Sequence, residues 1–332
     1  MSKKSNQPCS IIITNYNGKR LLSECLPSVI EAAFKHDGRD EIIVVDDRST
    51  DGSPEYLAEQ FPSVRLQVNL ANVGFQRATN IGAMIARFPI IVLLNNDVAV
   101  EPDSIARLCE CFERHDNLFA ASAKLFGWDR STFLAGRRVA VFEEGHFRLR
   151  NVNGDEARER LTLFATGGAA AFDREKFLEL GGFDPIFHPL YWEDIDLCYR
   201  AHKRGWPVIY APAAVMYHKH RATVAAATDP RRLRLITARN SYIFLYKNIL
   251  DCNMLREHLL FSLKFFLTDT LKGQFRFQRA FLMALPKLPE ILRRRRAERR
   301  ARPLPDAGVI ERIAAGEIVA GERRPSFDSR RG

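Results

Sequence analysis

Two amides and a carboxylate follow a strongly apolar stretch in the first third of the chain. Residues 90–94 read Ile-Ile-Val-Leu-Leu, and the next three are Asn95, Asn96 and Asp97. Such a run is typical of a strand buried on both faces of a parallel sheet, and these sheets bind ligands at the carboxyl ends of their strands. Oxygen ligands there would suit Mg²⁺ or Mn²⁺ holding a diphosphate. Taken alone, Asp97 is more typical of a turn or a helix cap.

A second polar group follows the apolar run that begins at residue 41, where Asp46 and Asp47 stand at the expected strand exit. A carboxylate at this point can accept hydrogen bonds from a nucleobase N–H or from ribose hydroxyls. The segment containing Asn72, Gly74 and Arg77 could bring backbone N–H groups and a helix N-terminus close to a nucleotide. Neither stretch matches GxGxxG or GxxxxGK[ST], which argues against a dinucleotide oxidoreductase and a P-loop enzyme.

Two further clusters lie near residue 200. Trp192, Glu193 and Asp194 follow a Gly-Gly-Phe-Asp-Pro loop. Acidic residues suit the first turn of a helix, but a carboxylate here could also act as a general base toward an attacking hydroxyl. His218 and His220 would share one face of a strand, so either imidazole could complete a metal site, although an isolated histidine is more often structural.

The elements that must position these residues alternate between strand and helix. Strands are predicted over residues 10–15, 41–47, 64–70 and 90–97, and helices over 19–34, 53–60 and 74–87. This order indicates right-handed βαβ units and a parallel sheet. Further on, we predict helices over 102–114, 174–180 and 192–204, strands over 119–126 and 208–217, and a loop or hairpin over 128–160.

The order of eight short motifs carries a family resemblance over about residues 9 to 220. The motifs are TNYNG, VDDRSTDGS, NVGF, LLNND, TGGAAAF, GGFDP, WEDIDLCYR and YHKH. This set resembles the inverting family 2 glycosyltransferases, especially their rhamnosyltransferase branch. The resemblance implies an α/β fold of the GT-A type, the nucleotide-diphospho-sugar transferase fold, with a Rossmann-like, mostly parallel sheet, helices on both faces and a C-terminal helical extension.

The same resemblance implies roles for individual residues. Those it matches to donor-binding positions are Thr14, Tyr16, Asp46 and Asn96, and the residues expected beside them from the strand and loop pattern are Asp47, Asn72, Gly74 and Arg77. Those expected to bind a divalent cation, Mg²⁺ or Mn²⁺, are Asp97 and His218. Asp194 matches the catalytic base, with Glu193 beside it, and the residues expected to contact the acceptor are Gly167, Gly168 and Trp192. Asn95 stands where many members carry Asp, which leaves the identity of the metal open.

The predicted function is transfer of a sugar, with inversion, from a UDP- or dTDP-sugar such as dTDP-rhamnose to a hydroxyl of a glycan or lipid-linked acceptor in cell-surface polysaccharide synthesis. Two alternatives remain at this point. One is a non-catalytic nucleotide-sugar-binding protein. The other is a sugar nucleotidyltransferase, although TNYNGKR is a poor match to the Gly-rich basic loop that would hold a triphosphate.

The positive charge is concentrated near the carboxyl end. The formal net charge is +10, and residues 271–300 hold ten Lys or Arg against two Glu. We therefore divide the chain into a catalytic domain (1–220), an amphipathic basic helical extension (221–300) and a flexible tail (301–332). The apolar stripe of the extension could pack on the catalytic domain or attach to an anionic membrane surface. Nucleic acid is not an expected partner. The oligomeric state is open.

Composition sets the remaining expectations. A chain of 332 residues with 46% hydrophobic and 27% charged residues is ordinary for a globular protein. Its six cysteines form no CxxC pair, so free thiols are expected. The chain shows neither a signal peptide nor a membrane-spanning run, which predicts a cytoplasmic protein, peripheral at the inner face of the membrane if the basic region binds lipid.

Overall fold

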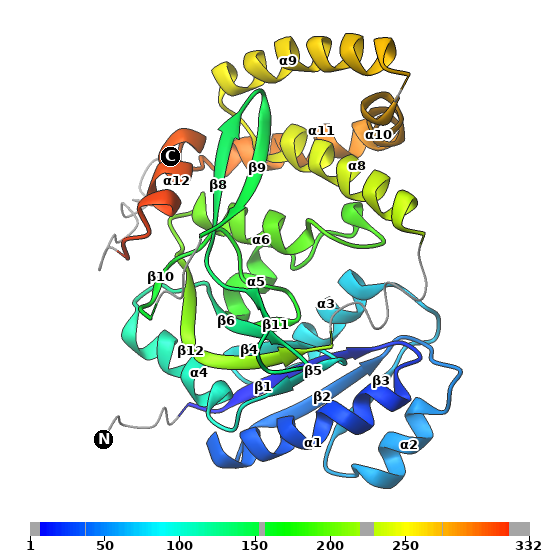
Figure 1. Ribbon diagram of the computed structural model, residues 1–332. Helices are drawn as coiled ribbons and strands as arrows, with labels where there is room; N and C mark the ends of the chain where they lie inside the picture. Colours follow the sequence, from blue (N-terminus) through cyan, green and yellow to red (C-terminus); the bar gives the residue numbers. More distant parts are fainter. Residues whose placement is uncertain (1–6, 37, 153–156, 220–228, 274, 319–332) are drawn as a thin grey trace, which may run out of the picture.

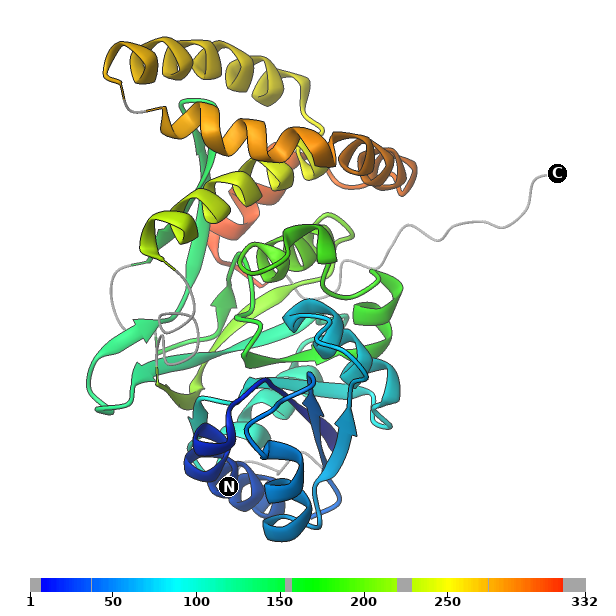
Figure 2. The same ribbon diagram turned by 90° about the vertical axis from the view of Figure 1, so that its right-hand side faces the viewer.

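The structure is a computed structural model and describes residues 7–36, 38–152, 157–219, 229–273 and 275–318. A central mixed sheet has helices on both faces, and a further layer of helices lies beyond one of those faces (Figures 1 and 2). The predicted α/β class with a C-terminal helical extension is confirmed.

The first half of the chain alternates between strand and helix as predicted. Its elements are β1 (Cys9–Asn15), α1 (Lys19–His36), β2 (Glu41–Asp46), α2 (Ser53–Gln60), β3 (Arg65–Val68), α3 (Phe75–Ile85) and β4 (Ile90–Asn95). The four strands are parallel in the order β4-β1-β2-β3. Their carboxyl ends therefore meet at one edge of the sheet.

The second half extends the sheet with strands of both directions. Its elements up to residue 218 are β5 (Val98–Val100), α4 (Ser104–Arg114), β6 (Ala120–Gly127), β7 (Phe133–Ala135), β8 (Arg138–Glu143), β9 (His146–Asn151), β10 (Arg160–Leu161), β11 (Ala169–Asp173), α5 (Arg174–Glu179), η1 (Pro185–Phe187), α6 (Glu193–His202) and β12 (Val208–His218). The full order is β10-β12-β6-β11-β4-β1-β2-β3. Strand β11 runs antiparallel to both of its neighbours, so the sheet is parallel in its first half and mixed beyond.

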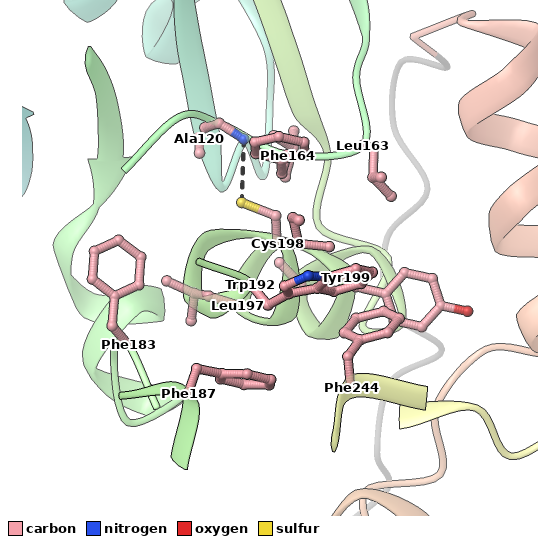
Figure 3. Packing of buried hydrophobic residues seen from close by; sticks show 14 of the residues in the cluster. Ala120, Leu163, Phe164, Phe183, Phe187, Trp192, Leu197, Cys198, Tyr199 and Phe244 are labelled. Atoms are coloured by element: carbon pink, nitrogen blue, oxygen red, sulfur yellow. Dashed lines mark hydrogen bonds between the residues drawn. The ribbon is translucent and has the colours of Figure 1, made fainter. Parts of the chain in front are cut away.

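Alternate residues of the buried strands face two separate cores. In β1, Ile11 and Ile13 pack in the core that contains α1 and α4, whereas Ile12 packs in the core beneath α3, α5 and α6. This division explains the continuous apolar runs at the centres of β1, β2 and β4, because both faces of the sheet are covered. The second core is rich in aromatic rings around α6, including Phe187, Trp192 and Phe244 (Figure 3).

The segment predicted as a loop or hairpin is largely a hairpin. Strands β8 and β9 pair antiparallel and project away from the main sheet toward the C-terminal helices (Figure 1). At the hairpin turn, Gly145 donates its backbone N–H to Glu257 over 2.8 Å, and its carbonyl lies 2.7 Å from Nδ1 of His258. A Cβ at Gly145 would lie 2.7 Å from the His258 backbone, so only glycine allows this contact.

The C-terminal region is helical, as predicted, but its first helix packs into the core of the preceding domain. The helices are α8 (Pro230–Asn248), α9 (Cys252–Leu271), α10 (Arg276–Ala284), η2 (Leu285–Lys287), α11 (Leu288–Arg300) and α12 (Asp306–Ala315). Lys247 of α8 is buried and binds Asp184 at 2.6 Å and Asp196 at 2.7 Å. The predicted boundary at residue 220 thus precedes a helix that shares the core of the preceding domain.

The prediction of a flexible tail over residues 301–332 is wrong for α12. Its first residue, Asp306, is buried and accepts hydrogen bonds from the Tyr199 hydroxyl and the Lys203 ammonium, each at 2.7 Å. Val309 and Ile313, one turn apart, are also buried. The Pro-rich and charged composition misled the prediction, because three buried side chains are enough to hold this helix in place. Residues 319–332 lie outside the described part of the chain.

Two expectations from composition concern the whole chain. All six cysteines are free thiols, as predicted. Within the described residues, none of the helices has the length and apolar character needed to cross a membrane.

Candidate active site

Side chains at the ends of three adjacent strands are joined by hydrogen bonds. The Asn96 amide donates to the Asn15 carbonyl oxygen over 2.7 Å, and the Asn15 amide donates to Oδ2 of Asp46 over 2.9 Å. This chain connects the ends of β4, β1 and β2. The sequence-based expectation that these strand ends lie together is therefore confirmed, and Asn15, which that analysis did not assign to the site, is the link between them.

The two aspartates after β2 are both buried and both already accept hydrogen bonds. Asp46 accepts from the Ser49 backbone N–H at 2.8 Å and from the Ser49 hydroxyl at 2.6 Å. Asp47 accepts from the backbone N–H groups of Val73 and Gly74, at 2.9 and 2.8 Å. Those N–H groups, which we expected near a nucleotide, instead fix the loop before α3. The donor-binding roles of Asp46 and Asp47 remain predictions.

Asp97 has the features of a cation ligand. Its side chain is buried, and Oδ1 accepts no hydrogen bond from any described residue. The same oxygen lies 3.1 Å from Nε2 of His218, which reaches it from the end of β12. A buried carboxylate oxygen without a donor is costly, and a carboxylate beside an imidazole is a suitable ligand pair for a divalent ion. These residues therefore fit the expected Mg²⁺ or Mn²⁺. His220, the alternative ligand, lies outside the described residues.

Gly167 and Gly168 connect the Asn95–Asp97 turn to Asp194. The Gly168 carbonyl accepts from the Asn95 backbone N–H at 3.0 Å, and the Gly167 N–H donates to Oδ2 of Asp194 at 3.4 Å. A Cβ at Gly168 would lie 2.2 Å from the Asn95 side chain. These contacts tie Asp194 and the end of β4 together, and the acceptor contact expected of the two glycines stays a prediction.

Asp194, the predicted general base, accepts hydrogen bonds from two backbone N–H groups. It lies in the first turn of α6, partly exposed, and its Oδ1 accepts from the Ile195 backbone N–H at 2.8 Å. Burial raises the pKa of Asp194, and the N–H groups of Gly167 and Ile195 and the charge of Arg138 offset part of that rise. A carboxylate with a raised pKa is a stronger base than an ordinary surface aspartate.

The two residues before Asp194, Glu193 and Trp192, contact other helices. Glu193 is buried, and burial together with the charge of Asp194 raises the pKa of Glu193 to about 8. Its carboxyl accepts from the Gln76 amide at 3.4 Å, on the α3 side. Trp192, expected at the acceptor site, is only 6% exposed, and its ring packs 5.1 Å from that of Phe244 (Figure 3). Helix α8 thus covers the ring of Trp192, and its predicted acceptor contact stays a prediction.

The remaining predicted donor residues lie on the open side of the site. Tyr16 is 45% exposed, Thr14 is partly exposed, and Asn72 and Arg77 are exposed. A Cβ at Gly74 would lie 2.9 Å from Nδ1 of His188, so the loop before α3 touches the loop that leads to Asp194.

Two residues near Asp194 were not predicted from the sequence. Arg138 on β8 stacks over Phe164 with 4.8 Å between the guanidinium carbon and the ring centroid. Burial lowers the pKa of Arg138, and the charge of Asp194 acts against that shift. Tyr191, next to the base region, is 41% exposed with a positive φ of 69°. Nothing in the local sequence separates Arg138 from other basic residues of the 128–160 stretch.

Comparison with known proteins agrees with this geometry. A family model described as glycosyltransferase like family 2 matches residues 7–238. An N-acetylglucosaminyl-diphospho-decaprenol L-rhamnosyltransferase from Mycobacterium tuberculosis is 29% identical over 230 residues, covering 61% of this chain and 74% of that protein.

Solved glycosyltransferase structures share the fold. The mannosyltransferase PcManGT from Pyrobaculum calidifontis, in complex with GDP-Man and Mn²⁺, has a TM-score of 0.54 at 20% identity, covering 93% of this chain and 85% of that one. GalNAc-T7 with UDP, GalNAc and Mn²⁺ has a TM-score of 0.58 at 16% identity, and the alignment covers 82% of this chain and 58% of that one. The protein is thus a member of glycosyltransferase family 2, with the GT-A fold.

Proposed function

We propose that this protein is a metal-dependent, inverting glycosyltransferase that uses a nucleotide-diphosphate sugar. The observation that carries the proposal is the buried Asp97 oxygen, which accepts no well-formed hydrogen bond from the described residues and whose one charged neighbour there is Nε2 of His218, 3.1 Å away. That arrangement suits a cation and its bound diphosphate better than it suits a structural carboxylate, which would be hydrogen-bonded. A binding protein would need this pair but would have no use for Asp194 as a base.

Each part of the site then has a defined task. Asp97 and His218 would hold the divalent ion, which stabilises the negative charge of the departing diphosphate. The Asn15–Asn96 hydrogen bond fixes the strand end that carries Asp97. Asp194 takes the proton from the acceptor hydroxyl as that oxygen attacks the anomeric carbon. A single displacement inverts the configuration, so the mechanism requires no covalent enzyme intermediate.

Donor and acceptor classes follow from the relatives. The mycobacterial relative is named as a rhamnosyltransferase acting on a diphospho-decaprenol-linked sugar. By analogy, we propose a UDP- or dTDP-sugar donor, dTDP-rhamnose in the first instance, and a polyprenyl-diphosphate-linked acceptor in cell-surface polysaccharide synthesis.

A transfer assay with Asp194→Asn tests the chemistry. With a panel of UDP-, dTDP- and GDP-sugars, Mn²⁺ and a short-chain lipid-linked acceptor, we expect the wild type to use one donor class. Asp194→Asn should lower kcat by at least about 100-fold, because a general base contributes this much, and should leave nucleotide binding unchanged. Asp116→Asn, at an exposed position after α4, is the control. Equal turnover by the two variants would refute the role of Asp194.

We also propose that α9 docks on an anionic membrane surface, where a lipid-linked acceptor would be found. Its outward face carries large apolar side chains that are 47 to 87% exposed, namely Leu259, Leu260, Leu263, Phe266, Leu267 and Leu271. The opposite face of α9 packs on the β8–β9 hairpin through His258 and Phe265. The outward face is at the end of the molecule farthest from α1 (Figures 1 and 2).

Charge favours a lipid surface as the occupant of this face. Exposed basic side chains occur on α9 and at its end, namely Arg256, Lys264 and Lys272, and others occur on α10 and α11, namely Arg279, Arg293 and Arg296. Each such residue near an anionic surface contributes about 1 kcal/mol of attraction. The pairing of apolar and basic side chains is typical of helices that lie in the interface of a bilayer.

Flotation with vesicles containing phosphatidylglycerol tests this docking. The wild type should float with the vesicles, and a Leu263→Asp, Leu267→Asp double variant should not, because two charges would enter the apolar layer. Phe34→Asp is the matched control, since Phe34 is 82% exposed but lies on α1. Undiminished flotation of the double variant would refute the membrane assignment and would leave the glycosyl-transfer proposal untouched.

A further inference from the structure

A buried cluster of two thiols and an imidazole lies at the opposite end of the sheet from the active site. Cys9 is the first residue of β1, His36 the last residue of α1, and Cys109 lies within α4. The three side chains are 0%, 4% and 0% exposed. One ligand atom from each, two sulfurs and a ring nitrogen, lies within 4.8 Å of the other two. Strand β1 separates this cluster from the Asn15 end by seven residues, or roughly 20 Å.

The imidazole of His36 is held by a carboxylate beside the two sulfurs. Its Nδ1 lies 2.8 Å from Oδ2 of Asp40, while Nε2 is buried and has no hydrogen-bond partner among the described residues. Oδ1 of the same aspartate accepts from the Cys9 backbone N–H at 2.8 Å. A neutral imidazole that donates from Nδ1 to a carboxylate presents the lone pair of Nε2, and this carboxylate–histidine pair is the usual outer support of a metal-binding histidine.

The other candidate explanations account for the cluster less well. A purely structural histidine in the core would be expected to pair both nitrogens, since an unsatisfied buried polar atom costs about 1–3 kcal/mol. Cys111 lies two residues after Cys109, but its Sγ donates to the Arg107 carbonyl, so it turns away from the cluster. One ring nitrogen of His36 lies within 4.8 Å of both sulfurs, and thiol groups are the ligands that soft metal ions prefer.

We propose that Cys9, His36 and Cys109 bind one thiophilic metal ion, Zn²⁺ or Cu⁺, as a structural site. Binding exchanges the two thiol protons, released to solvent, for two metal–thiolate bonds, and Nε2 supplies the third bond without losing a proton. With Zn²⁺, the two thiolates balance the charge of the ion inside the apolar core. The metal ion would link the start of β1 and the end of α1 to α4. It would take no part in sugar transfer.

Metal analysis of the full-length protein tests this site. Protein produced in medium supplemented with zinc or copper and purified without chelators should hold about one equivalent of one of these metals. Cys9→Ala, His36→Gln and Cys109→Ala should each lower this to below about 0.1 equivalent. Cys111→Ala is the matched control, since it removes a buried thiol from the same helix and should keep the metal.

A second measurement uses the wild type alone, so it does not depend on whether the variants fold. Titration of metal-free wild type with Co²⁺ should produce a thiolate-to-cobalt charge-transfer band with release of about two protons per ion. Wild type that holds no zinc or copper and gives no such band would overturn the proposal, as would equal metal loss in Cys111→Ala. A Cys9–Cys109 disulfide in freshly isolated protein would also overturn it.

Discussion

The raised pKa of Glu193 predicts how the stability of this protein depends on pH. Burial and the neighbouring Asp194 raise the pKa of Glu193 from 4.5 to about 8. The folded protein therefore retains a proton that the unfolded chain loses above pH of about 4.5. Because the native state binds more protons in this interval, its stability falls as pH rises, and the loss is complete above the folded pKa.

The magnitude follows from the size of the shift. Each pKa unit corresponds to about 1.4 kcal/mol, so the full shift sets an upper limit of about 5 kcal/mol between pH 4.5 and pH 8. Glu193→Gln is nearly isosteric and cannot ionise, and its amide can still meet Gln76, which lies 3.4 Å from the carboxyl. We expect the variant to match the wild type near pH 5 and to exceed it by several kcal/mol at pH 9.

Urea denaturation at pH 5, 7 and 9 measures the free energy of unfolding of each protein. Glu175→Gln, at an exposed position on α5, serves as the control and should follow the wild type. A difference between Glu193→Gln and the wild type that stays constant across the three pH values would refute the reasoning, since it would mean that Glu193 is ionised throughout.

Two further predictions concern packing and buried charge. Gly168→Ala should lower the free energy of unfolding by about 1–3 kcal/mol and reduce transfer, because its Cβ would lie 2.2 Å from the Asn95 side chain. Gly308→Ala, in open space on α12, is the control and should leave stability unchanged or raise it. Urea denaturation of the two variants measures the difference. Lys247→Met should cost about 3 kcal/mol or more, because it leaves two buried carboxylates without the ammonium they share. Lys264→Met, at an exposed position, is the control, and equal melting temperatures would contradict the second prediction.

The sequence predicted the parts of the fold that depend on local pattern. The apolar runs of β1, β2 and β4 are buried on both faces, which is why they are continuous and why the strands could be recognised. The meeting of their carboxyl ends followed from the parallel arrangement alone. Asp97 and His218 come together for a different reason: β5, which begins at Val98, pairs antiparallel with the end of β12 and places Val98 opposite His218.

The sequence was uninformative where a distant element decides the environment of a residue. Trp192 is buried because Phe244 of α8 packs on it, and local sequence carries no information about that contact. Asp47 accepts hydrogen bonds from the N–H groups of the loop before α3, a contact that a strand-exit pattern does not reveal, and its donor-binding role stays a prediction. In α12 a signal was present, since Val309 and Ile313 are one turn apart, but the surrounding Pro and Arg obscured it.

The most direct test of the proposed function is calorimetric titration with UDP, dTDP and GDP, each with and without Mn²⁺, using the wild type and Asp97→Asn. We predict that one nucleotide diphosphate binds the wild type tightly only when Mn²⁺ is present, and that Asp97→Asn weakens this binding at least about tenfold, equivalent to about 1.4 kcal/mol. Identical affinity with and without the metal, unchanged in Asp97→Asn, would contradict the assignment of Asp97 and His218 as the cation site.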